Sequence, residues 1–122
     1  MPLPQCQFEG DDDANTIHIG GFIGDDLLAV ASAYKRNKSS ISEGIGYQLR
    51  GMASAKAARG KGLGRMVLNE AEHAAKTVGA DYLWANARIS ALGFYQKAGY
   101  EVIGAEFMIQ GVGLHRIIMR KL

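Results

Sequence analysis

The sequence predicts a layered domain of mixed α/β class, with strands and helices in the order β-β-β-α-β-α-β-β. Three observations support this prediction. The chain has 122 residues, of which 48% are apolar, so it can bury one core and is too short for two ordinary domains. Segments rich in β-forming residues flank one amphipathic segment, and many of the 16 glycines stand between such segments, where turns are expected. We therefore expect one domain over residues 1–122.

The first half of the chain predicts three strands. Residues 16–23 are rich in β-formers, Gly24-Asp25-Asp26 is a turn sequence, and the mostly apolar residues 27–34 return as the second strand of a hairpin. Polar residues and breakers follow over 35–46, which predicts a loop. Residues 47–54 alternate in character and predict the third strand.

The second half begins with the predicted amphipathic helix, over 63–78. Its apolar residues fall on one helical stripe: Leu63, Val67, Ala71, Ala74 and Val78. After this helix the sequence predicts a strand over 82–88 and a short helix over 91–98. Strands over 100–103 and 114–122 complete the predicted sheet.

Composition excludes several classes of protein. The 14 basic and 12 acidic residues give a net charge of +2, too small to indicate a nucleic-acid-binding protein. No apolar run approaches the ~20 residues of a membrane span, and no secretory signal is visible. The single cysteine, Cys6, favours a reduced, cytoplasmic protein and is expected to be a passive thiol. The three histidines lack metal-ligand spacing, so no metal is expected.

The glycine-rich segment Arg59-Gly60-Lys61-Gly62-Leu63-Gly64-Arg65 is the sharpest feature of the chain. Glycines allow close approach of a ligand, and free amides at a helix N-terminus bind anions, so the segment predicts a phosphate or pyrophosphate cradle. The P-loop pattern fails because Lys61 is followed by glycine, and the dinucleotide pattern fails because its glycine spacing is one residue short. A tight turn without a ligand is the structural alternative.

Several motifs together resemble the GNAT family of N-acetyltransferases. Residues 59–64 fit the family's [Q/R]-x-x-G-x-[G/A] loop, and residues 49–54 resemble the strand before it. Residues 85–88 and 91–100, which include Phe-Tyr-Gln-Lys-Ala-Gly-Tyr, resemble the family's second cofactor segment. Residues 111–115 resemble the ending of one small bacterial branch.

The resemblance implies a mostly antiparallel central sheet and acetyl-CoA as cosubstrate. It implies that backbone groups of 52–54 pair with the pantetheine arm and that amides of 59–65 hold the pyrophosphate. Asn86 would contact the pantetheine or the acceptor, and Tyr95 would act as general acid toward the departing thiolate. The implied cofactor-binding residues are Met52, Ala53, Ser54, Arg59, Gly60, Lys61, Gly62, Leu63, Gly64, Arg65, Asn86 and Tyr95.

The general base stays open at this point. No glutamate stands on the strand before the loop, where many relatives place one. His115, His18 and Glu43 are candidates, and His115 is also a candidate contact to the acceptor. Cys6 has no partner visible in the sequence, so we expect direct transfer to the acceptor rather than an acyl-enzyme.

The N-terminus departs from the family pattern. Most relatives begin with a strand followed by helices that wall the acceptor pocket. Here residues 8–16 carry four acidic side chains and predict a polar lead-in, with the first strand at Thr16. We therefore expect an N-terminally reduced sheet, and we hypothesise that a homodimer covers its exposed edge.

These expectations lead to one function and two alternatives. The leading prediction is an N-acetyltransferase that moves the acetyl group of acetyl-CoA directly to a primary amine of a small molecule or peptide. The first alternative is a catalytically degenerate module that binds acyl-CoA without turnover, motivated by the short N-terminal region. The second is another nucleotide-binding protein, which the loop spacing disfavours.

Overall fold

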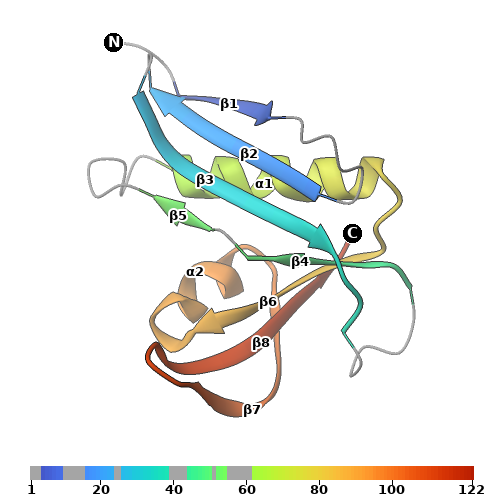
Figure 1. Cartoon of the computed structure of the whole chain (residues 1–122), viewed down its shortest axis with the longest axis vertical. Helices are drawn as coiled ribbons and strands as arrows, with labels where there is room; N and C mark the ends of the chain where they lie inside the picture. The colour runs from blue at the N-terminus through green and yellow to red at the C-terminus, as the bar shows by residue number, and fades with distance from the viewer. Residues whose placement is uncertain (1–3, 10–15, 24–25, 39–43, 51, 55–61) are drawn as a thin grey trace.

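The computed structural model describes residues 4–9, 16–23, 26–38, 44–50, 52–54 and 62–122. Strands and two helices follow one another along the chain and build one mixed sheet with helical cover (Figure 1). The elements are β1 (Pro4–Glu9), β2 (Thr16–Ile23), β3 (Asp26–Lys35), β4 (Gly46–Leu49), β5 (Ala53–Ser54), α1 (Leu63–Thr77), β6 (Tyr82–Arg88), the 3₁₀ turn η2 (Ile89–Ala91), α2 (Leu92–Lys97), β7 (Glu101–Ile109) and β8 (Gly113–Lys121).

The described strands form an eight-stranded sheet in the order β1-β2-β3-β4-β6-β8-β7, with β5 also paired to β3. Neighbouring strands are antiparallel except β4 and β6, which run parallel. A parallel pair needs a crossover connection, and α1 supplies it between β5 and β6. The predicted mixed α/β class with a mostly antiparallel sheet is confirmed.

The N-terminal strand β1 corrects the prediction that the sheet begins at Thr16. Residues 4–9 pair antiparallel with residues 18–23 of β2, so β2 lies between two strands and is not an edge. The sequence PQCQFE does alternate between apolar residues (Pro4, Cys6, Phe8) and polar residues, so β-strand periodicity marks this segment and the prediction overlooked it. The pairing with β2 agrees with that pattern.

The third predicted strand is divided into β4 and β5. The pairing with β3 includes Ala33↔Leu49 for β4 and Val30↔Ala53 for β5, so the two short strands follow the same neighbour. The sequence carries a signal at this break that the prediction of one strand overlooked, because the alternation of residues 47–50 stops at Gly51, and the apolar residues Met52 and Ala53 then stand side by side.

Helix α1 buries one face against the sheet, mainly on β2 and β3 (Figure 1). The buried residues of α1 are Leu63, Val67, Leu68, Ala71, Glu72 and Ala75, so the predicted stripe holds at Leu63, Val67 and Ala71. Val78 is wrong as a core residue: it is 50% exposed and forms the C-cap of the helix. The two layers approach closely, since a Cβ built on Gly21 of β2 would lie 2.6 Å from Cγ2 of Val67.

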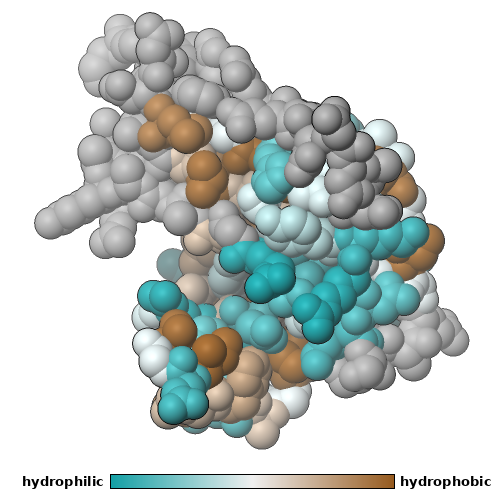
Figure 2. Space-filling model, in the orientation of Figure 1, coloured by the Kyte–Doolittle hydropathy of each residue, from teal (hydrophilic) through white to brown (hydrophobic). Residues whose placement is uncertain are grey.

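The face of the sheet opposite α1 is turned toward the viewer in Figure 1. Figure 2, in the same orientation, shows hydrophilic residues gathered across the middle of this face. Among the described residues, neither helix is long and apolar enough to cross a membrane.

Candidate functional site

The sheet opens between β4 and β6. The two strands pair in parallel only from Gly46↔Tyr82 to Gln48↔Trp84. Beyond that point β5 pairs with β3, while β6 pairs with β8 as far as Arg88. Figure 1 shows β5 and β6 diverging from this junction. Within the described residues, the facing edges of 49–54 and 85–88 therefore lack a ladder between them.

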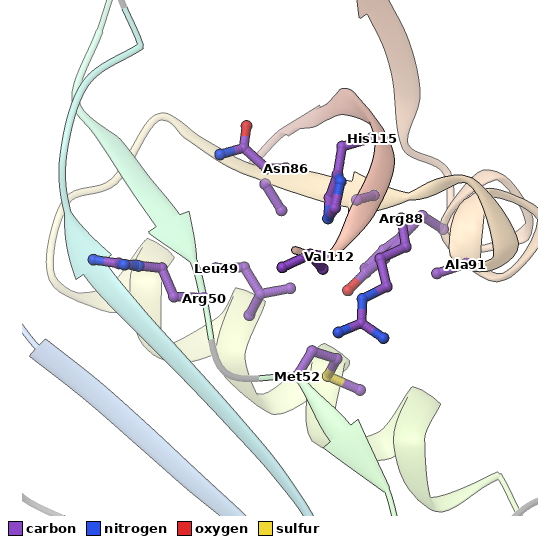
Figure 3. Close-up of a pocket in the computed structure, with 11 residues that line it drawn as sticks. Leu49, Arg50, Met52, Asn86, Arg88, Ala91, Val112 and His115 are labelled. Atoms are coloured by element: carbon purple, nitrogen blue, oxygen red, sulfur yellow. The ribbon is translucent and has the colours of Figure 1, made fainter. Parts of the chain in front are cut away.

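A cleft of about 450 Å³ lies at this opening (Figure 3). Its described lining comes from β4, the segment before β5, β6, η2, α2 and the β7–β8 hairpin. The lining residues are Leu49, Arg50, Met52, Ala85, Asn86, Ala87, Arg88, Ala91, Tyr95, Val112 and His115. A volume of this size suits a small ligand or one end of a larger one.

The cleft runs past the edge of β6 and reaches both faces of the sheet. Four consecutive residues, 85–88, line it, and consecutive strand residues point to opposite faces. Ala85 and Ala87 belong to the buried core, whereas Asn86 and Arg88 are exposed. The helix side of the cleft is therefore apolar and its other side polar.

Tyr95 of α2 lines the helix side. It is 6% exposed, and its ring meets Phe94 and Tyr100 edge-on at centroid distances of 5.2 and 5.6 Å. Burial raises the pKa of Tyr95 to about 12, because the phenolate loses its hydration. The hydroxyl therefore keeps its proton at neutral pH and is available as a hydrogen-bond donor.

His115 of β8 lines the opposite side of the cleft, and its ring points inward in Figure 3. The side chain is 4% exposed and packs beside the Phe107 ring at a centroid distance of 5.9 Å. Its Nδ1–H donates to the carbonyl oxygen of Gly113 at 2.8 Å. A carbonyl oxygen only accepts, so in the neutral ring the proton is on Nδ1 and the lone pair on Nε2.

The N-terminus of α1 lies beside the cleft. A Cβ built on Gly64 would lie 3.7 Å from Cε of Met52 and 4.0 Å from the Phe94 ring. Gly62, the N-cap, is left-handed with φ 74°, a conformation that favours glycine. The first turn has no acidic residue, and no side-chain cap is present among the described residues, so its amides remain available to an anion.

The structure brings several of the predicted site residues together. Met52, Asn86, Tyr95 and His115 line one cleft although they come from four separate segments. The predicted loop residues at the start of α1 lie on its first turn: Gly62, Leu63, Gly64 and Arg65.

The other predicted site residues divide into two groups. Ala53 and Ser54 form β5, whose backbone pairs with β3. Arg59, Gly60 and Lys61, with the candidate base Glu43, lie outside the described residues.

Two predicted site residues have other surroundings than the sequence suggests. Leu63 is fully buried, so its side chain belongs to the core and only its backbone reaches the site. His18 lies on β2, where its Nδ1 is 2.8 Å from Oγ of Ser32, and it does not line the cleft. No group of three metal-ligating side chains occurs among the described residues.

Two arginines of the cleft were not predicted. Arg88 is two residues after Asn86 on β6, and residues two apart on a strand point to the same face. The sequence could therefore have placed Arg88 beside the predicted site residue Asn86. Arg50 follows Leu49 directly after the end of β4, where strand alternation no longer predicts the direction of a side chain.

Three comparisons relate this geometry to known proteins. The model of the Acetyltransferase (GNAT) family matches residues 1–100. The uncharacterized N-acetyltransferase YitI of Bacillus subtilis is 31% identical over 120 residues, which cover 98% of this chain and 80% of that protein.

Two solved structures share the fold. An acetyltransferase of the GNAT family from Elizabethkingia anophelis, with acetyl-CoA bound, superposes with a TM-score of 0.73 at 11% identity, and 98% of each chain is covered. An IAA acetyltransferase from Bacillus cereus superposes with a TM-score of 0.72 at 16% identity, covering 98% of this chain and 99% of that one.

Proposed function

Because the chain belongs to the acetyltransferase (GNAT) family, we propose that it transfers the acetyl group of acetyl-CoA directly to a primary amine of a small molecule or peptide. Membership of the family makes it an acyl-CoA-dependent acetyltransferase; the amine acceptor is our proposal. The observation that carries the proposal is that Tyr95 and His115 line opposite sides of one cleft in the opened sheet. A proton donor and a proton acceptor thus flank the space where transfer would take place.

The residues around the cleft fit acetyl-CoA. The pantetheine arm carries amide groups, and the backbone of Leu49, Ala53 and Ser54 offers partners for them on the edge that has no ladder to another described strand. The pyrophosphate is an anion, and the uncapped first turn of α1 offers amides and the positive end of the helix dipole. Arg65 adds positive charge on that turn, where its Nε–H also donates to Oδ1 of Asn69.

His115 is our proposed general base. An amine attacks a thioester as the neutral species, so a proton must leave the nitrogen before or during attack. Nε2 of His115 is the ring nitrogen that holds the lone pair, because Nδ1–H is engaged by the carbonyl oxygen of Gly113. The hairpin therefore orients the ring and selects the tautomer, as an orienting partner does for other catalytic imidazoles.

Tyr95 is our proposed donor to the thiolate that leaves. Its pKa of about 12 exceeds that of an ordinary thiol, about 8.5, by about 3.5 units, so complete transfer to a free thiolate costs about 5 kcal/mol. A hydrogen bond from the neutral hydroxyl has no such cost and stabilises the developing charge. Backbone amides on the open edge of residues 52–54 are the proposed partners of the thioester oxygen.

Binding and turnover are tested separately. In a thermal-shift titration, acetyl-CoA at 100 times its dissociation constant stabilises the protein by about 2.7 kcal/mol. We expect a shift on the order of 10 °C with acetyl-CoA and none with ATP or NAD. Release of CoA thiol on addition of primary amines then distinguishes an enzyme from a module that only binds. Stabilisation without thiol release from any amine would contradict the proposed reaction.

Homodimer formation and a cytoplasmic location remain predictions. Light scattering at tens of micromolar measures the first, and a monomeric mass would reject it. The dimer was expected to cover an unpaired edge of β2. In the structure β1 pairs with β2 along that edge, so this argument for a dimer does not hold.

A further inference from the structure

The ionisable side chains of the cleft are unbalanced in charge. The described lining residues include two arginines and no aspartate or glutamate. Arg88, the last residue of β6, is exposed and forms no ion pair with another described residue. Arg50 lies with its guanidinium 5.9 Å from the centroid of the Tyr34 ring, a contact that leaves its N–H donors free for another partner.

These charges lie on the sheet face opposite α1. Arg88 pairs directly with His115 across β6 and β8, and partners in an antiparallel ladder point to the same face. Arg50 lies over the ring of Tyr34, an exposed residue of β3 next to the core residue Ala33, so it lies on that face as well. Figure 3 shows Arg88 extending into the cleft and Arg50 at its rim. Tyr95 approaches from the helix side, so the arginines belong to the side of the base.

We propose that the acceptor is a small primary amine that also carries a carboxylate, and that Arg88 binds this carboxylate while Arg50 contributes from the rim. This inference rests on the proposed function, because it assigns the His115 side of the cleft to the acceptor. A guanidinium presents a planar fork of N–H donors that matches a carboxylate with two parallel hydrogen bonds. Such a clamp would set the distance from the carboxylate to the amine that faces His115.

The same charges act against other amines. An acceptor with several ammonium groups would bring like charges to Arg50 and Arg88, and no described lining carboxylate compensates them. We therefore expect polyamines to be poor substrates. An amine without any charged group would lose the clamp but meet no repulsion.

The test compares pairs of acceptors that differ only in the carboxylate. CoA thiol release is measured with free amino acids, with their primary amides and with spermidine. The quantity of interest is the ratio of kcat/KM for each amino acid to that for its amide, in wild type and in Arg88→Gln. Because both proteins meet the same two amines, the intrinsic reactivity of each amine cancels in this comparison. Arg36→Gln is the matched control, since it removes one exposed arginine outside the cleft.

We expect wild type to prefer the free amino acids and Arg88→Gln to lower the ratio by about tenfold or more, as for loss of a hydrogen bond to a charged group. The KM for the amino acid rises, the KM for acetyl-CoA changes less than twofold, and Arg36→Gln keeps the ratio of wild type. Arg50→Gln lowers the ratio by a smaller factor.

Three outcomes overturn the inference. The first is use of the amides or of spermidine at least as well as the free acids. The second is absence of thiol release with every carboxylate-bearing amine. The third is a raised KM for acetyl-CoA in Arg88→Gln, which makes Arg88 a cosubstrate contact. Failure of the proposed function has a different signature: wild type then shows no acetyl-CoA binding by calorimetry, or no thiol release with any amine.

Discussion

The hydroxyl of Tyr100 donates a hydrogen bond to Oε2 of Glu72 at 2.8 Å and thereby ties the start of β7 to the middle of α1. Glu72 is 9% exposed and also accepts from Nη1 of Arg120, at 3.1 and 3.2 Å to its two carboxylate oxygens. The same Nη1 donates to the carbonyl oxygen of Ala98, which follows α2. The carboxylate of Glu72 thus links α1 to the start of β7 and to β8, and Arg120 extends the link to the end of α2.

Glu72→Gln should lower the free energy of unfolding by about 1–3 kcal/mol, because the charged acceptor of two hydrogen bonds is lost while Tyr100 stays buried. Chemical denaturation measures the change. Glu70→Gln, on the exposed face of the same helix, is the matched control and should stay within about 0.5 kcal/mol of wild type. Equal stability of the two variants would show that the cluster contributes nothing.

Two substitutions at Gly62 distinguish the effect of a negative charge from the effect of backbone strain. Gly62→Asp and Gly62→Asn have side chains of the same shape, and both residues tolerate the left-handed conformation that Gly62 adopts. Only aspartate places a negative charge at the uncapped start of α1, so acetyl-CoA should bind Gly62→Asp about tenfold or more weakly than Gly62→Asn. Calorimetry measures both affinities. Equal values would remove this turn from the proposed cosubstrate site.

His115→Gln should lower kcat by about 100-fold or more at neutral pH and leave acetyl-CoA affinity unchanged, since the base but not the cosubstrate contact is removed. The loss should shrink as pH rises, because the acceptor amine then loses its proton to water. His73→Gln, on the exposed part of α1, should keep the kcat of wild type. A pH-independent loss would assign His115 a positioning role instead.

Tyr95→Phe should lower kcat by about 10- to 100-fold without weakening acetyl-CoA binding, because the ring and its contacts remain. An equal loss of affinity would make Tyr95 a packing residue. Tyr95→Phe should also change how the free energy of unfolding depends on pH.

Burial raises the pKa of Tyr95 to about 12, above the value near 10 of an unfolded tyrosine. The associated stability is complete below pH 10 and is lost as pH rises toward 12, at up to about 3 kcal/mol. Burial and the nearby Glu72 raise the pKa of Tyr100 as well, so this residue adds to the alkaline loss. Tyr95→Phe should therefore lose less stability than wild type between pH 10 and 12, measured by denaturation at each pH. A parallel loss in both proteins would contradict the assigned burial.

The structural features that could be predicted from the sequence are those that depend on residues close together in the chain. The helical stripe identified the face of α1 that Leu63, Val67 and Ala71 bury, and the glycine pattern identified the turn where Gly62 is left-handed. The prediction missed β1, although Pro4, Cys6 and Phe8 alternate with polar residues, because the segment is only six residues long and continues into the acidic segment 9–13. It also missed Arg50 and Arg88 as neighbours, because the divergence of β4 and β6 depends on contacts between residues far apart in the chain.

The parallel pairing of β4 with β6 has a further consequence for how the molecule is held together. The described strands on one side of that junction come from residues 4–54, and those on the other side come from residues 82–121. The sheet thus consists of two antiparallel halves that are joined by only three parallel residue pairs between β4 and β6, from Gly46↔Tyr82 to Gln48↔Trp84. The pantetheine arm proposed to bond to the backbone of β5 would add hydrogen bonds just beyond the point where these pairs end. Under that proposal, binding of acetyl-CoA would strengthen the junction between the two halves of the sheet.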